Sequence, residues 1–283
     1  MGKLFEHIRE KKTFPSVLII GLTLILYLSL WIGTSFLFEA HGKDLITSLF
    51  LESSDSKEYA LLAENLKNEG VFSESRNSPF SPETLRTPGY PLFIAILLSL
   101  FGSLYSVIFF QIVLVALTTL FIFNIGTKVH SSLVGGAAAF LFAIDPTTIY
   151  HALTAFSDVL FVFLFVTVVY FLFFSSIART RYFILIGVIL GGAILVRPIA
   201  LFIIPLLLLA YILIKKEKFF DVATYKPLLF FCLGIALVVT PWGARNYIHF
   251  GSPNISSIGP YNLLFYNVPE FIATNQGISP EET

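Results

Sequence analysis

Charged residues are scarce in this chain. Asp, Glu, Lys and Arg make up 13% of the 283 residues, whereas an ordinary soluble domain carries roughly 25%. A soluble fold with so few charged residues could not cover its surface with polar groups, because 56% of the chain is hydrophobic. The composition therefore predicts that the lipid bilayer is the solvent for much of the molecule.

Cysteine is almost absent as well. The one cysteine, Cys232, lies in an apolar run, which excludes a disulfide within the chain and argues against a metal site built on cysteine. The His-Glu-x-x-His and Gly-x-Ser-x-Gly motifs of metalloproteases and hydrolases are missing too. The 18 basic and 18 acidic residues balance, so net charge gives no reason to expect a nucleic-acid partner.

Long apolar runs are what the chain does contain. A membrane-spanning helix needs about 20 apolar residues. The first uncharged stretch, from Thr13 to Phe38, is far longer than the core of a signal peptide, which has about 7–15 residues. We therefore predict an all-α, polytopic membrane protein with seven spans, at residues 16–38, 104–126, 132–149, 157–176, 181–197, 198–214 and 227–241.

The basic residues indicate which way the spans run. With one span in the uncharged run 87–127, 11 of the 18 basic residues lie on the cytoplasmic side, but with two spans only six do. The positive-inside rule thus favours one span there, a cytoplasmic N-terminus and a multi-pass protein of the cell membrane. Residues 39–103 then form an outer loop with interfacial helices, since 91–101 is too short to cross, and 242–283 form an outer tail.

The ionisable residues gather on the outer side in this topology. Asp145, Asp158, Arg197 and Arg245 all fall at outer helix ends, near the long hydrophilic loop. Ionisable groups near a membrane usually face a cavity or a partner. For Arg197 a second interpretation stays open, in which its long side chain simply reaches the lipid headgroups. For Asp158, which follows Ser157, the local pattern favours a helix-capping role.

Two patterns in the outer loop suggest local structure. The stretch from Asp55 to Gly70 predicts a helix that lies along the membrane with an apolar face of Tyr59, Leu62 and Leu66. Asp55 and Glu58 resemble a capping box, so the local pattern favours Asp55 as the N-cap over a catalytic role, although the two roles are compatible. The segment from Leu85 to Pro91 predicts a rigid turn that contains Arg86.

Four motifs in this order resemble bacterial glycosyltransferase family 39. They are Asp55-Ser-Lys-Glu-Tyr-Ala60, Arg86-Thr-Pro-Gly-Tyr-Pro-Leu-Phe93, Val196-Arg-Pro198 and Pro241-Trp-Gly-Ala-Arg-Asn-Tyr247. The family includes relatives of dolichyl-phosphate-mannose–protein mannosyltransferases and of the lipid A aminoarabinose transferase. The resemblance implies the GT-C fold, with a seven-helix membrane module and a catalytic first outer loop.

The resemblance also implies a reaction. These enzymes move a hexosyl or pentosyl group from a polyprenyl phosphate to an acceptor hydroxyl on a protein, lipid or glycan, usually with inversion, at the outer face of the membrane. The catalytic Asp of the family falls on Asp55. Donor phosphate contacts fall on Arg86, Arg197 and Arg245. Supporting roles are expected for Glu58, Tyr59, Glu83 and Asp158.

The resemblance leaves some features open. Leu85 stands where the aminoarabinose transferases have an acidic residue, and Glu83 lies two residues earlier. The family is mixed in its use of a divalent cation, and no His/carboxylate cluster in the sequence decides this point. Relatives continue beyond the seventh span, so we expect the tail 242–283 to be truncated. The alternatives are a transporter or flippase for lipid-linked sugars, or a truncated, non-catalytic membrane module.

Overall fold

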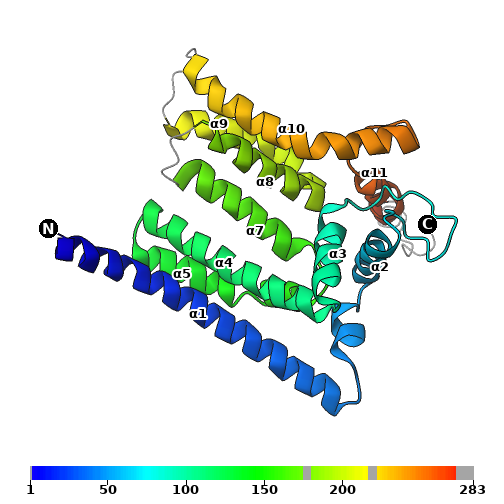
Figure 1. The fold of residues 1–283 in the computed structure, drawn as a ribbon, viewed down its shortest axis with the longest axis horizontal. Helices are drawn as coiled ribbons and strands as arrows, with labels where there is room; N and C mark the ends of the chain where they lie inside the picture. Colours follow the sequence, from blue (N-terminus) through cyan, green and yellow to red (C-terminus); the bar gives the residue numbers. More distant parts are fainter. Residues whose placement is uncertain (1, 175–179, 216–221, 272–283) are drawn as a thin grey trace.

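A computed structural model describes residues 2–174, 180–215 and 222–271. These residues form helices and connecting segments without a strand (Figure 1). The π-helical turns are η1, η2 and η4, and η3 is a 3₁₀ helix. In chain order the elements are α1 (Gly2–Ala40), η1 (Ile46–Phe50), α2 (Ser54–Asn68), α3 (Gly89–Phe101), α4 (Tyr105–Val129), α5 (Ser132–Ala143), α6 (Pro146–Leu153), α7 (Asp158–Val169), η2 (Tyr170–Phe174), α8 (Tyr182–Val196), η3 (Pro198–Ile203), α9 (Ile204–Lys215), α10 (Val222–Phe250), α11 (Ile258–Asn262) and η4 (Leu263–Asn267).

Helices occur in all seven ranges predicted to span the membrane, but their lengths differ. Within the described residues, three helices are long and apolar enough to cross, at Pro15–Ala40, Tyr105–Val129 and Tyr225–Phe250. The pair α5 and α6, bent by 53°, would make a fourth span if it crosses as one unit. The apolar helices 158–174, 182–196 and 198–214 are shorter. Seven crossings and their direction therefore remain predictions.

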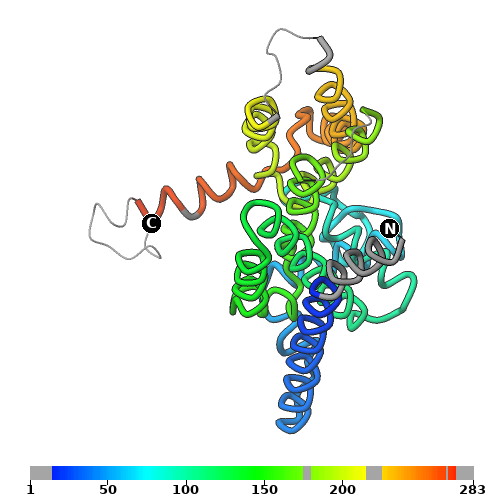
Figure 2. The backbone as a smooth tube through the Cα atoms, turned by 90° about the vertical axis from the view of Figure 1, so that its left-hand side faces the viewer, coloured from blue at the N-terminus to red at the C-terminus, as the bar shows by residue number. Residues whose placement is uncertain are grey.

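The long helices lie alongside one another, and the loop elements gather at one end. Figure 1 shows α2, α3 and α11 at the same end of the stack formed by α4, α5 and α7–α10. α1 packs on α4 along part of its length, and its C-terminal end projects beyond the other helices (Figures 1 and 2). The segment between α1 and α4 and the segment that follows α10 thus lie at the same end of the stack.

α2 packs against α3. Its position along the membrane surface, which the sequence pattern predicts, stays a prediction. Tyr59 and Leu62 on its apolar face are buried, and Leu66 packs against the same core. Because α3 offers an apolar surface of its own, with Tyr90 and Ile94 fully buried, the two loop helices cover each other. Their contact fixes the position of α2 relative to the long helices.

α8 and α10 cross at a very short distance. A Cβ atom added at Gly187 would lie 2.0 Å from the Phe231 carbonyl oxygen, and one at Gly234 would lie 2.2 Å from that of Ile184. Small residues at such crossings let two membrane helices bring their backbones together. α10 contains Pro227 and Pro241 but continues to Phe250, so the tail predicted to start at residue 242 begins as helix.

Candidate functional site

The centre of the site is an ion pair between the loop and α2. Arg86 Nη2 donates to Asp55 Oδ1 at 2.6 Å, and Nη1 donates to Oδ2 at 3.3 Å. Arg86 Nε donates to Glu58 Oε2 at 2.8 Å. Asp55 and Glu58 are three residues apart on α2, so their side chains lie on one face of the helix. A single guanidinium therefore contacts two carboxylates, and its contact with Asp55 is bidentate.

Asp55 is available for this pair because another residue caps α2. Ser53 is the N-cap, and its Oγ accepts a hydrogen bond from the Ser56 backbone N–H at 3.0 Å. The prediction that Asp55 is the N-cap is therefore wrong. Asp55 lies in the first turn of α2 instead, and its side chain is 43% exposed, against 12% for that of Arg86. The carboxylate is thus open to solvent on one side and held by a shielded guanidinium on the other.

The Arg86 guanidinium lies over the ring of Tyr59. Arg86 Cζ lies 5.3 Å from the centre of the Tyr59 ring, a distance at which a cation and an aromatic face attract each other. The Tyr59 ring meets Tyr90 edge to face at 5.0 Å. Tyr90 donates from its hydroxyl to Gln111 Oε1 at 2.6 Å, and Gln111 donates to backbone carbonyl groups at the end of α6. Buried side chains therefore connect Arg86 to the helix stack.

A second ion pair links the start of α7 to the end of α8. Arg197 Nη2 donates to Asp158 Oδ2, and Arg197 Nε donates to Ser157 Oγ at 3.1 Å. The expectation that Asp158 caps α7 is wrong, since Ser157 occupies the N-cap position and Asp158 is the first helical residue. His151, which sequence reasoning missed, has its Nδ1 3.8 Å from Asp158 Oδ1. For Arg197 the pairing favours a partner over simple contact with lipid headgroups.

The turn that contains Arg86 is attached to the last turn of α8. Thr87 is buried and donates from its Oγ1 to the Val196 carbonyl oxygen at 3.2 Å. Gly89 lies so close that an added Cβ would be 2.6 Å from the backbone of that turn. Because Arg197 directly follows Val196, these contacts couple the backbone positions of Arg86 and Arg197.

Arg245 and Glu83 take part in backbone contacts rather than in either ion pair. Arg245 Nη1 donates to the Glu83 carbonyl oxygen at 2.6 Å, and Nη2 donates to that of Phe72 at 3.4 Å. The Glu83 carboxylate accepts from the backbone N–H groups of Thr84, at 2.7 Å, and Leu85. Both residues therefore hold the segment that leads into Arg86.

Glu74 is a further carboxyl group near the site, and no sequence motif indicated it. Its Oε1 is buried and has no hydrogen-bond partner among the described residues. Burial raises the pKa of Glu74 to about 7, and the nearby carboxylates of Glu83 and Glu58 act in the same direction, whereas Arg86 lowers it. Near neutral pH this side chain can therefore hold or release a proton.

No arrangement of metal ligands accompanies these groups. Within residues 2–174, 180–215 and 222–271, no group of three or more His, Cys, Asp or Glu side chains could hold a metal ion. The carboxylates nearest the expected chemistry are paired with arginine instead, Asp55 and Glu58 with Arg86 and Asp158 with Arg197.

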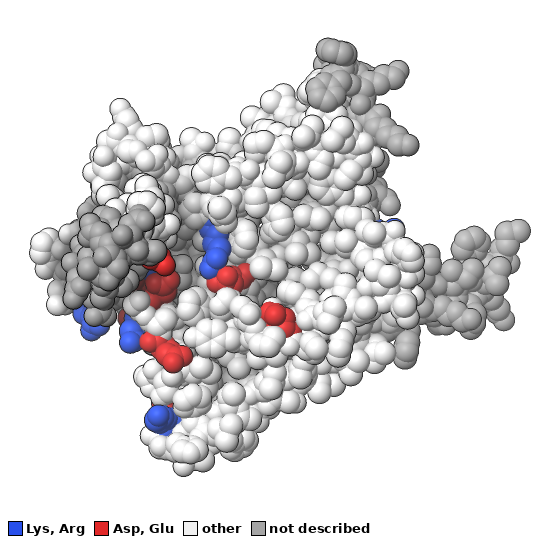
Figure 3. All heavy atoms as spheres, turned by 180° about the vertical axis from the view of Figure 1, so that it is seen from behind, with Lys and Arg blue, Asp and Glu red and all other residues white. Residues whose placement is uncertain are grey.

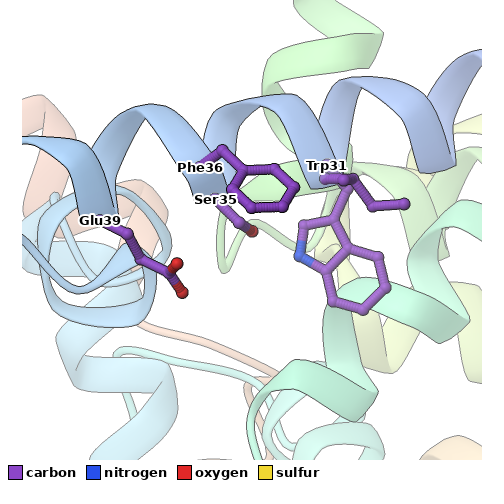
Figure 4. A pocket seen from close by; sticks show the side chains of 5 residues that line it. Trp31, Ser35, Phe36 and Glu39 are labelled. Atoms are coloured by element: carbon purple, nitrogen blue, oxygen red, sulfur yellow. The ribbon is translucent and has the colours of Figure 1, made fainter.

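The surface shows where the charges lie. On the face drawn in Figure 3, most charged side chains lie in the half toward α2 and α3, and the rest of that face is largely uncharged. A cavity of about 180 Å³ is found elsewhere, along the C-terminal half of α1 (Figure 4). Its lining residues, none of which belongs to either ion pair, are Trp31, Ile32, Ser35, Phe36 and Glu39.

Comparison with known proteins agrees with the motifs. A search of curated proteins and a search of solved structures found no significant match. A family model of dolichyl-phosphate-mannose-protein mannosyltransferases matches residues 85–243, more than half of the chain, and includes Arg86, Asp158 and Arg197. This match confirms the family predicted from the motifs. The chain therefore belongs to the dolichyl-phosphate-mannose-protein mannosyltransferase family, whose members are membrane glycosyltransferases with a polyprenyl-phosphate sugar as donor.

Proposed function

We propose that this protein transfers a sugar from a polyprenyl phosphate to an acceptor hydroxyl at the outer face of the cell membrane, with inversion at the anomeric carbon. The acceptor is a protein, lipid or glycan. The observation that carries the proposal is the bidentate pair between Arg86 and Asp55. In this pair a guanidinium, which suits phosphate, contacts a carboxylate, which can accept a proton.

Donor binding proceeds by exchange of ion-pair partners. Without donor, the Arg86 guanidinium is held by Asp55 and Glu58. The donor is a phosphodiester anion, and its oxygen atoms fit the same fork of N–H groups that Asp55 occupies. When the phosphate takes that place, the partly exposed Asp55 carboxylate is released beside the bound sugar. Tyr59 keeps the guanidinium in position through its ring contact.

The transfer itself is a direct displacement. The acceptor oxygen forms a bond to the anomeric carbon while the bond from that carbon to the phosphate oxygen breaks. The acceptor proton passes to Asp55, and the electron pair of the broken bond leaves with the polyprenyl phosphate. General-base catalysis of this kind contributes ~10²–10⁴-fold. Arg86 stabilises the negative charge that develops on the leaving phosphate.

Arg197 is the second donor contact in this proposal. Its side chain is 39% exposed and is held by Asp158, so it can exchange a carboxylate for a phosphate as Arg86 does. Thr87 ties the backbone of the Arg86 turn to the residue before Arg197. In this proposal Arg86 and Arg197 contact the same phosphate group.

An Asp55→Asn variant tests the proposal. Washed membranes that contain the wild-type or the variant protein would be incubated with radiolabelled sugars on polyprenyl phosphate, and the label in protein, lipid and glycan fractions would be counted. We expect transfer with the wild type and a loss of about 10²–10⁴-fold with Asp55→Asn, since the amide cannot take the proton.

Glu64→Gln serves as the matched control, because Glu64 is an exposed carboxylate of the same helix. It should transfer at the wild-type rate. Retained turnover in Asp55→Asn would remove Asp55 as the base. Folded wild-type protein that transfers no sugar from any donor in the panel would contradict the transferase proposal itself.

A further inference from the structure

We propose that Arg245 and the segment from Asn254 to Ser257, here called the strap, position Arg86 and do not bind the donor phosphate. The inference rests on the proposed function of Arg86 as the donor contact. It assigns a role to residues beyond position 243, where the family match ends.

The strap is bonded directly to the two residues before Arg86. Ser256 Oγ donates to the Leu85 carbonyl oxygen at 2.6 Å. The Ser257 backbone N–H donates to the Thr84 carbonyl oxygen at 3.0 Å, and the Thr84 hydroxyl donates to Ser257 Oγ at 3.0 Å. These bonds join positions more than 170 residues apart in the chain. The backbone path into Arg86 is therefore set by the strap.

The strap is in turn held by α10. The buried Asn246 side chain donates to the Asn254 carbonyl oxygen at 2.6 Å, and Trp242 Nε1 donates to that of Ile255 at 2.8 Å. α10 itself is fixed against α8 by their close crossing. The order of support thus runs from α8 through α10 and the strap to the residues before Arg86.

Arg245 contacts the segment just before the residues that the strap holds. Its guanidinium donates to the carbonyl oxygens of Glu83 and Phe72, and the Phe72 carbonyl also accepts from the Glu83 backbone N–H at 3.1 Å. Its Cζ lies 4.7 Å from the centre of the Trp242 ring. Arg245 therefore closes the loop between Phe72 and Glu83 where this loop meets α10.

These contacts distinguish a positioning role from phosphate binding. An arginine that is held by carboxylates can exchange them for a phosphate, which is also an anion. If Arg245 left its carbonyl partners for a phosphate, the acceptors of Phe72 and Glu83 would lose a donor and the loop would open. The strap residues Ser256 and Ser257 carry no charge, yet they act on the same turn.

The test combines Arg245→Met with a covalent substitute for its contacts. In a Cys232→Ala background, Thr84→Cys and Ser257→Cys replace two hydroxyls that lie 3.0 Å apart, so oxidation can join them by a disulfide. We expect Arg245→Met to lower kcat about tenfold and to raise the donor KM, because it displaces Arg86, the group that contacts the donor phosphate and stabilises it as it leaves. Oxidation of the cysteine pair should restore most of this loss.

Ser256→Ala is the milder second variant, and it should lower kcat in the same way. Arg86→Met with the oxidised cysteine pair is the control, and it should not be restored. Amide hydrogen exchange of residues 84–89 gives a readout that does not depend on transfer. It should be faster in Arg245→Met and slow again after oxidation.

A raised donor KM in Arg245→Met that oxidation does not restore would overturn the positioning role, because it would indicate direct contact with the donor. Unchanged amide exchange in Arg245→Met would overturn it as well. If the wild-type protein transfers no sugar but exchange changes as expected, the proposed transferase activity fails while the support of the Arg86 turn stands.

Discussion

Arg86 lies in the loop between α2 and α3, and Arg245 on α10 contacts the same loop, but different groups hold the two side chains. Arg86 is held by the carboxylates of Asp55 and Glu58. Arg245 is held by two backbone carbonyls and by the side-chain oxygen of Asn246, none of which is charged. An incoming phosphate can replace a carboxylate, since both are anions that accept paired N–H groups. If it replaced the backbone carbonyls at Arg245, those carbonyl oxygens would each lose a hydrogen-bond donor, which has a cost in free energy. The groups that hold an arginine therefore indicate whether it is suited to bind an anionic ligand. Its presence in a sequence motif does not.

Among the tests of this comparison, the largest effect is expected when the same substitution is made at each arginine in turn. Arg86→Gln should lower transfer by about 10²–10³-fold, as loss of a group that stabilises developing charge typically does. Arg245→Gln removes the same charge but should lower it only about tenfold, through a displaced loop. Initial rates at saturating donor measure both. Equal losses at the two positions would break the comparison.

Sequence patterns located the charged residues of the site but not their partners. The motif around Asp55 was informative, yet its helix-capping interpretation failed because Ser53, two residues earlier, supplies a better-placed oxygen. Asp158 was misassigned for a similar reason, since its partner Arg197 lies about 40 positions away in the chain. Local patterns report contacts within a turn, whereas the Asp158–Arg197 pair depends on how α7 and α8 pack, and the Asp55–Arg86 pair on how the loop returns to α2.

The fold was predicted unevenly as well. Apolar runs gave the positions of the long helices, because length and hydropathy are properties of the local chain. The packing of α2 against α3 was not predicted, because an apolar helix face looks the same whether it meets lipid or α3. Glu74 had no local signal at all. Its environment is made by Glu58, Glu83 and Arg86, which come from other parts of the loop and from α2.

The next effect concerns the attachment of the Arg86 turn to α8. Gly89→Ala adds a methyl group that would lie 2.6 Å from the backbone of α8, and overpacking of this kind costs about 1–3 kcal/mol. We expect a lower thermal midpoint in detergent and a lower transfer rate. Gly136→Ala is the control, since an added Cβ there meets nothing within 4 Å. Equal thermal midpoints for the two variants would show that the close contact at Gly89 does not affect stability.

The smallest effect should be a change in pH dependence. The pKa of Glu74 is raised to about 7, so the folded protein binds its proton more tightly than the unfolded chain does. Stability from this group is therefore present at low pH and is lost as pH rises through about 7. Glu74→Gln should melt at a higher temperature than the wild type at pH 8, and at a similar temperature at pH 5. A constant difference across this range would contradict the assignment.

The second carboxylate on Arg86 has a consequence for turnover. Glu58 contacts the same guanidinium as Asp55, although the proposed reaction needs only one proton acceptor. The donor is a phosphodiester, but the product, polyprenyl phosphate, is a monoester with one more ionisable oxygen and a stronger attraction to arginine. A pair of carboxylates that competes for Arg86 opposes this attraction. Under the proposed reaction, Glu58 therefore hastens product release and relieves product inhibition.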